Sequence, residues 1–89
     1  MDRSPMQVLE SETALTMTQL AYVTGGLFTK GRNKGQPDRR RGLELVESGA
    51  VKPIDPSQPV HRLKVWTDEA RRYLAEGPRR DAQPLRSVS

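Results

Sequence analysis

"QPDRRRGLELVESG", residues 36–49, has the pattern of a short helix with a basic start and an apolar face. Pro37 suits the first helical position, and Asp38 suits the positive end of the helix dipole. Ser48 and Gly49 supply a stop, because glycine readily adopts the left-handed conformation that follows many helices. The stretch therefore predicts a helix that begins at Pro37 and stops at Ser48.

The two sides of this helix differ in chemistry. Leu43 and Val46 lie three residues apart and are expected to face the core. Arg39 and Arg40 would then lie towards solvent. Gly42 inside a helix costs roughly 1 kcal/mol against alanine. Either it allows the close approach of another backbone, or the helix begins after it.

A second helix is expected just before this one, in LTMTQLAYVTGG, residues 15–26. Thr16 and Gln19 form the pattern of a capping box, in which each side chain accepts a hydrogen bond from the other residue's backbone N–H. Leu20 and Val23 continue at helical spacing, and the paired glycines end the helix after about eight residues.

The link between these helices, GLFTKGRNKGQ (26–36), contains three glycines, so a long regular element through it is not expected. It begins a basic cluster that continues into the next helix and is opposed by one acidic residue, Asp38. Six of the chain's fifteen lysines and arginines belong to this cluster: Lys30, Arg32, Lys34, Arg39, Arg40 and Arg41.

The following segment has two β-like runs, residues 51–54 and 60–66, separated by the turn sequence DPSQP. This arrangement predicts a β-hairpin. Because proline cannot donate to a sheet ladder, the hairpin is expected at an edge or as a free-standing wing. Arg62 and Lys64 would share one face of its second strand, opposite the apolar positions.

A last helix is expected in TDEARRYLAEG, residues 67–77. Thr67 would cap its start and Gly77 would end it. Two acidic residues in its first turn suit the helix dipole. Its apolar face would consist of Ala70, Tyr73 and Leu74.

The chain divides into three parts by composition. Residues 1–13 are expected to be a flexible N-terminal segment, a tail or a short extra turn of helix, and residues 78–89 a disordered C-terminal tail. Residues 14–77 would form one small domain. With no cysteine, one histidine and no apolar run near the length of a membrane span, we expect no metal site, no membrane segment and a cytosolic protein.

The order helix, glycine-rich link, helix, hairpin, helix is the layout of a winged helix-turn-helix. This is an α+β fold with two core helices, a β-hairpin wing and a closing helix. The chain resembles the MerR-like winged-helix domain in the reduced form used by phage excisionases (recombination directionality factors). Four stretches carry the resemblance: MTQLAYVTG, RRRGLELVESGAV, KPID with HRLKVW, and TDEARRYL. The link is longer than the family's tight turn, and the DPSQP tip lacks the basic residues often found there.

The resemblance implies binding and bending of double-stranded DNA beside an attachment site. Such a protein promotes prophage excision by the phage integrase, in the bacterial host cytoplasm, and catalyses nothing itself. It also implies contact with the integrase and cooperative self-association on DNA. MerR-type regulators continue into a long dimerising helix and an effector domain, whereas twelve residues follow Gly77 here. A phage transcriptional regulator of the same fold and a non-DNA protein adaptor are the alternatives.

The basic residues are the candidate DNA contacts. Arg39 and Arg40 are expected at base edges or phosphates in the major groove, because arginine can fork onto guanine. The basic residues of the link would grip the phosphate backbone. The alternative is a solvated charged surface. The complete predicted DNA-binding set is Lys30, Arg32, Lys34, Arg39, Arg40, Arg41, Arg62 and Lys64.

No catalytic, cofactor-binding or metal-binding residue is predicted. GLFTKG, residues 26–31, mimics the start of a phosphate-binding loop, but Arg32 and Asn33 follow where that motif needs lysine and then serine or threonine. His61 has no cysteine or second histidine to complete a metal site. The aromatic residues Tyr22, Trp66 and Tyr73 are expected to be packing anchors, because the core is short of apolar mass.

Overall fold

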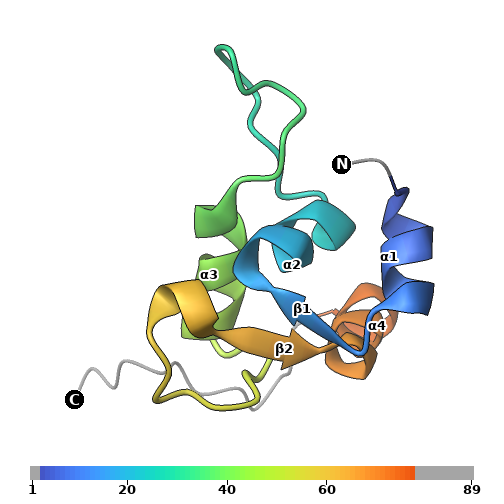
Figure 1. Cartoon of the computed structure of the whole chain (residues 1–89), viewed down its shortest axis with the longest axis vertical. Helices are drawn as coiled ribbons and strands as arrows, with labels where there is room; N and C mark the ends of the chain where they lie inside the picture. The colour runs from blue at the N-terminus through green and yellow to red at the C-terminus, as the bar shows by residue number, and fades with distance from the viewer. Residues whose placement is uncertain (1–2, 78–89) are drawn as a thin grey trace.

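Four α-helices surround a two-stranded antiparallel sheet in the computed structural model, which describes residues 3–77 (Figure 1). The expected α+β class is therefore confirmed, while the tail expected at residues 78–89 lies outside the described residues. In chain order the elements are α1 (Pro5–Ser11), β1 (Ala14–Thr16), α2 (Met17–Thr24), α3 (Arg39–Glu47), the short 3-10 helix η1 (Val60–Arg62), β2 (Lys64–Trp66) and α4 (Thr67–Glu76). Within residues 3–77, none of these helices has the length and apolar character needed to cross a membrane.

Helix α2 begins and ends where the sequence predicts. The Gln19 backbone N–H donates to the Thr16 hydroxyl at 3.2 Å, and the Thr16 N–H donates to the Gln19 side-chain oxygen at 2.9 Å. Gly25 ends the helix in the left-handed conformation, with φ of 80°. The capping box and the glycine stop are thus both confirmed, which is expected of signals that act within one helical turn.

Helix α3 begins slightly later than predicted. Asp38 is its N-cap, and the Asp38 carboxylate accepts a hydrogen bond from the Arg40 backbone N–H at 3.1 Å. Pro37 lies outside the helix, in an isolated β-bridge to Leu27. Satisfying a free N–H at the helix start outweighs the preference of proline for the first helical position. The predicted stop is confirmed, since Ser48 is the C-cap and is followed by Gly49 with φ of 83°.

Close contact between α2 and α3 depends on Gly42. A Cβ atom at this position would lie 2.2 Å from the Met17 carbonyl oxygen and 3.2 Å from the Ala21 nitrogen. The glycine therefore lies inside α3 and permits the close approach, and the alternative that the helix begins after it is wrong. Val46, one turn further on, is fully buried, and Leu43 is partly buried against the same core.

The strand β2 pairs with β1 and not with the segment that precedes it. Leu15 faces Val65 in this antiparallel pair, and both side chains are completely buried. The predicted hairpin between residues 51–54 and 60–66 is therefore wrong. The intervening prolines remove backbone donors, and the Ile54 N–H donates to the Lys64 carbonyl at 2.8 Å without forming a strand.

The N-terminal segment belongs to the packed body of the protein. Within residues 1–13, expected to be flexible, α1 is capped by Ser4 and places Val8 and Leu9 in the core. Tyr22 donates its hydroxyl to the Arg3 carbonyl oxygen, which ties the start of the segment to α2. Burial against a core formed by distant residues thus orders a stretch with little apolar content of its own.

Helix α4 closes the body but differs from its prediction at the start. Thr67 is the first helical residue and makes no capping bond, because its hydroxyl donates to the Glu12 carbonyl of the α1–β1 connection. Ala70 is fully buried as expected, whereas Leu74 is 48% exposed. Trp66, expected to be a packing anchor, is 52% exposed. Tyr22 and Tyr73 do pack against the core.

Asp55 organises the turn in the loop that replaces the expected hairpin. Its carboxylate accepts the Ser57 hydroxyl at 2.6 Å, the Ser57 backbone N–H at 3.0 Å and the Gln58 amide at 3.2 Å. These hydrogen bonds, the Ser57 hydroxyl first, lower the pKa of Asp55 below its usual 3.8. The turn is therefore stabilised above the ordinary titration range of aspartate and loses this stabilisation as the pH falls through the lowered pKa.

We expect an NMR titration of the Asp55 carboxyl carbon to give a midpoint below 3.8. Ser57→Ala should raise that midpoint, because it removes the hydroxyl donor and leaves the backbone donor in place. Gln58→Ala is the matched control and should raise it by less. An unchanged midpoint in Ser57→Ala would show that the hydroxyl does not hold the carboxylate in solution.

Candidate nucleic-acid interface

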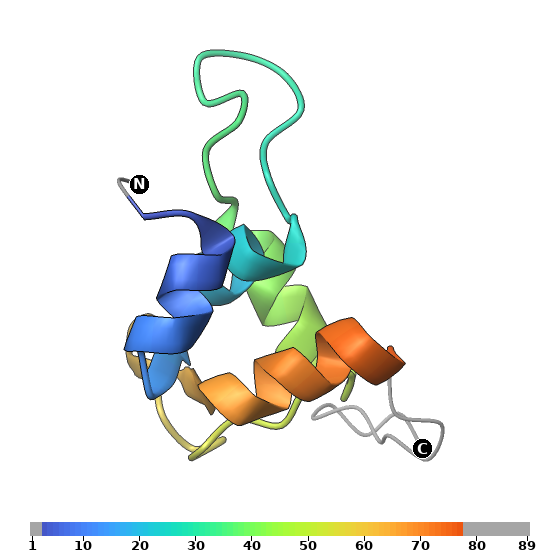
Figure 2. The ribbon, with the colours of Figure 1, turned by 90° about the vertical axis from the view of Figure 1, so that its right-hand side faces the viewer.

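The link between α2 and α3 forms a projecting finger, which we define as residues 27–37. Its root is closed by the bridge between Leu27 and Pro37 and by the Asp38 N–H, which donates to the Gly26 carbonyl at 2.9 Å. Further out, the Phe28 N–H donates to the Gln36 carbonyl at 2.9 Å. Figures 1 and 2 show the finger rising away from the helices, beyond the N-terminal end of α3.

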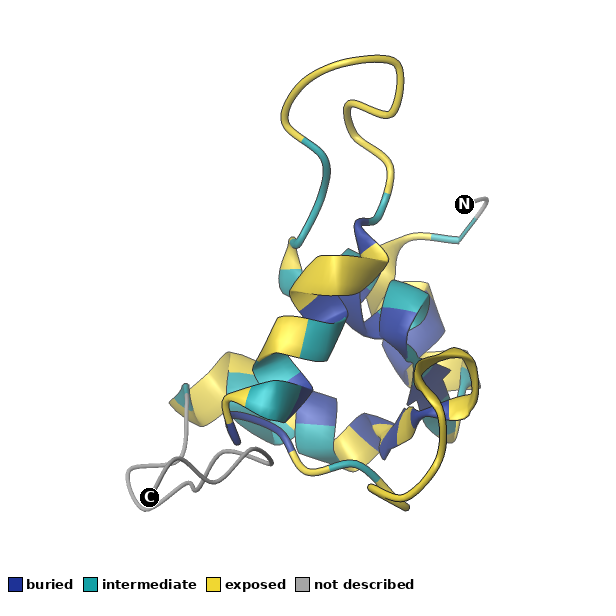
Figure 3. Cartoon of the chain, turned by 90° about the vertical axis from the view of Figure 1, so that its left-hand side faces the viewer, coloured by how far each residue is buried: buried dark blue, intermediate teal, exposed yellow. Residues whose placement is uncertain are grey.

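Glycines shape the outer part of the finger. Gly31 and Gly35 have φ of 80° and 87°, a region that other residues rarely adopt. The Lys34 N–H donates to the Gly31 carbonyl at 3.2 Å, which closes a turn over residues 31–34. All residues from 29 to 36 are exposed (Figure 3), so the side chains of the tip are presented to solvent.

The finger carries three positive charges and no negative one. Lys30, Arg32 and Lys34 are exposed, and none of them has an ion-pair partner within residues 3–77. The nearest carboxylate in sequence, Asp38, is 7% exposed and lies 3.4 Å from the Arg40 Nε. The charge of the finger is therefore available to an external anion.

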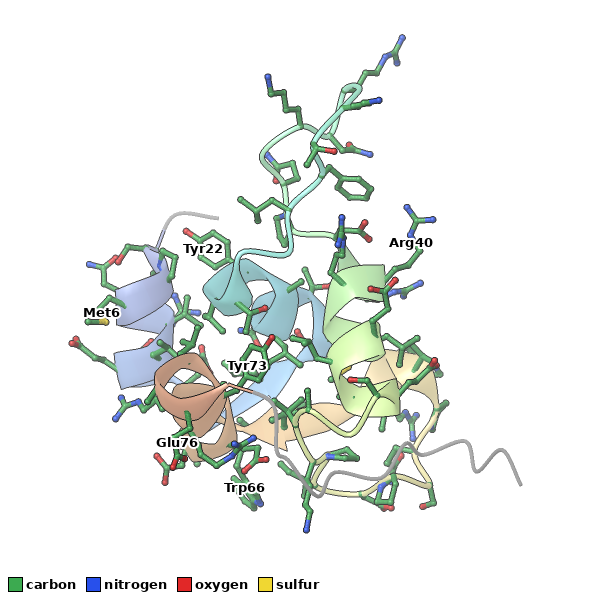
Figure 4. All side chains as sticks on the ribbon, turned by 180° about the vertical axis from the view of Figure 1, so that it is seen from behind. Met6, Tyr22, Arg40, Trp66, Tyr73 and Glu76 are labelled. Atoms are coloured by element: carbon green, nitrogen blue, oxygen red, sulfur yellow. The ribbon has the colours of Figure 1, made fainter. Side chains whose placement is uncertain are left out.

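The three arginines at the start of α3 point in different directions, because successive residues of a helix are about 100° apart. Arg40 extends from the body on the side opposite Met6 (Figure 4), and its side chain is 77% exposed. Arg39 is also exposed. The stem of Arg41 instead lies against Gly26, where an added Cβ would come within 2.5 Å of the Arg41 Cβ.

Arg41 lines a hollow of about 400 Å³ between the end of α2, α3 and α4. Thr24, Gly26, Glu44 and Tyr73 are among its other lining residues. The structure thus brings Arg39 and Arg40 to the root of the finger and turns Arg41 towards α4. The sequence predicted the major-groove contact for Arg39 and Arg40 and included Arg41 only in the wider DNA-binding set, and the structure places Arg41 apart from the other two.

The solvent face of α3 is basic only at its N-terminal end. Glu44 and Glu47 follow Arg40 at helical spacing of four and seven residues, so they lie on the same side of the helix. Glu44 is exposed. A uniformly basic helix face is therefore absent, and the positive charge of α3 is confined to its first turn.

Arg62 and Lys64 do not share a strand face as predicted. Arg62 lies in η1 and Lys64 in β2, so the alternation that would align them does not apply. Both are exposed. Figures 1 and 3 show η1 level with the C-terminal half of α3, whereas the finger extends from its N-terminal end. These two residues are therefore apart from the cluster at the finger.

The part of the chain that the structure describes holds no candidate metal site. No group of three or more histidine, aspartate or glutamate side chains that could hold a metal ion occurs there. His61 is exposed on η1. Comparison with known proteins found no matching family model, no matching curated protein and no matching solved structure.

Proposed function

We propose that this protein binds double-stranded DNA through the finger and the first turn of α3. The observation that carries the proposal is the gathering of exposed cations in the finger and the first turn of α3, where the nearest carboxylate in sequence, Asp38, is buried and paired with Arg40. A strongly positive projecting surface matches the phosphate backbone, whose charge dominates protein–DNA affinity. The five cations are Lys30, Arg32, Lys34, Arg39 and Arg40.

The proposed fold assignment is a small MerR-like winged helix-turn-helix. Its support is that α2 and α3 cross at close range through Gly42. In such domains the N-terminal residues of the second helix contact base edges. Arg39 and Arg40 occupy that position here.

The role we propose is that of a phage excisionase, which bends DNA at an attachment site and assists the integrase in the cytoplasm of a bacterial host. Its support is the resemblance described above. A phage transcriptional regulator of the same fold is the alternative. An excision assay with integrase and attachment-site DNA, run with and without this protein, separates the two roles.

A salt titration tests DNA binding itself. If the five cations each neutralise a phosphate, log affinity should fall against log salt with a slope of roughly −4.5. Fluorescence anisotropy with a labelled duplex of about two helical turns, at salt concentrations from about 50 to 200 mM, measures this slope. A flat response would favour a protein adaptor that meets an acidic partner.

A further inference from the structure

The finger and α3 are too wide to occupy one DNA groove together. In the proposed function, on which this inference rests, the first turn of α3 enters the major groove. A helix with its side chains is about 10–12 Å across and fills a groove of about 12 Å. The finger is fastened to the same end of α3 by the Asp38 N–H to Gly26 carbonyl bond of 2.9 Å. It must therefore leave the major groove across a phosphate backbone.

The length of the finger matches the distance to the next groove. Between the Leu27–Pro37 bridge and Arg32 each arm has four residues, which span at most about 15 Å because the turn from Gly31 to Lys34 is not extended, and the long Arg32 side chain adds to this reach. The centres of adjacent major and minor grooves lie about half of a 34 Å helical turn apart, or roughly 17 Å. The tip can reach the minor groove while the root stays beside α3.

The minor groove is wide enough for one side chain of the finger but too narrow for its paired backbone arms. Two paired strands lie about 4.8 Å apart before side chains are added, so the finger cannot enter a minor groove about 6 Å wide, whereas one side chain can. Arg32 lies in the terminal turn that follows Gly31, is exposed, and has no ion-pair partner within the described residues. Lys30 and Lys34 lie two residues to either side of it.

We propose that Arg32 enters the minor groove next to the major groove that α3 occupies, with Lys30 and Lys34 on the phosphates that border it. A·T-rich tracts have a narrow minor groove with enhanced negative potential, which attracts arginine. The finger therefore supplies a preference for an A·T tract beside the site that α3 contacts. The loop at residues 52–59 is unsuited to this role, since Asp55 occupies its turn and its one cation is Lys52.

Two duplexes and two variants test this proposal. The two duplexes have equal length and base composition. One contains an uninterrupted A-tract, and in the other the same A·T pairs are interrupted by pyrimidine–purine steps. The wild type should bind the A-tract duplex more tightly by roughly fivefold or more, the lower end of what one specific base-pair contact supplies. Arg32→Lys keeps the charge and should lose this preference, because lysine lacks the planar, weakly hydrated guanidinium group.

The double variant Lys30→Gln plus Lys34→Gln is the matched comparison. It should weaken binding to both duplexes alike and reduce the salt slope by about 1.8, without changing the preference. Retention of the A-tract preference by Arg32→Lys, or its absence from the wild type, would overturn the minor-groove contact while leaving DNA binding in place. Failure of the wild type to bind either duplex would overturn both proposals. Circular dichroism checks that each variant is folded.

Discussion

Gly42→Ala should destabilise the protein by about 3 kcal/mol or more, through a clash that neither helix can relieve alone. The new Cβ would lie 2.2 Å from the Met17 carbonyl oxygen, which is backbone and cannot rotate away. Alanine favours a helix interior over glycine by roughly 1 kcal/mol, so propensity alone predicts the opposite sign. The clash outweighs it, because separating α3 from α2 would also loosen the packing of the buried Val46.

Thermal unfolding followed by circular dichroism measures this effect. For a domain of this size, a loss of about 3 kcal/mol lowers the melting temperature by roughly 12–24 °C. Gly25→Ala is the control, since Gly25 has φ of 80° and open space around its Cβ position. Gly25→Ala should lower the free energy of unfolding by only about 1–2 kcal/mol, the penalty for an L-alanine in the left-handed backbone conformation. A Gly42→Ala protein as stable as the wild type would show that α2 and α3 do not cross this closely.

The double variant Arg39→Ala plus Arg40→Ala should lower DNA affinity by about a hundredfold and lower the salt slope by about 1.8. Two phosphate or base contacts are lost from the first turn of α3. The variant should still fold, because the Asp38 carboxylate caps α3 by accepting a hydrogen bond from the backbone N–H of residue 40, and alanine retains that N–H. The Arg40–Asp38 ion pair is highly exposed on the arginine side, so its loss costs little stability.

Arg62→Ala plus Lys64→Ala removes the same charge from the η1 and β2 side and is the matched control. We expect it to reduce affinity by less than about tenfold, because these residues are apart from the finger and can supply at most peripheral phosphate contacts. Anisotropy titrations of both double variants on one duplex make the comparison. An equal or larger loss in the control would place the DNA contact on the η1 side and contradict the assignment to α3.

Both ends of α2, the stop of α3 and the exposed basic cluster could be predicted from the sequence, because each depends on neighbouring residues. The capping box of Thr16 and Gln19 and the glycine stop after α2 act within a single turn. The lysines of the finger and Asp38, their one acidic neighbour before α3, are visible in the sequence, so an exposed basic cluster could be predicted there. Helical spacing also predicted that Arg39 and Arg40 face solvent, whereas the direction of Arg41 was decided by its packing against Gly26.

Strand pairing and the burial of the N-terminal helix were decided only by the tertiary structure. The partner of Val65 is Leu15, far away in sequence, because that pairing buries both side chains completely. Val8 lies in a polar segment and gives no local signal of burial. It is buried because α1 packs onto a core formed by residues distant in sequence. Local signals act through hydrogen bonds within one turn, whereas pairing and burial depend on surfaces that exist only when remote segments meet.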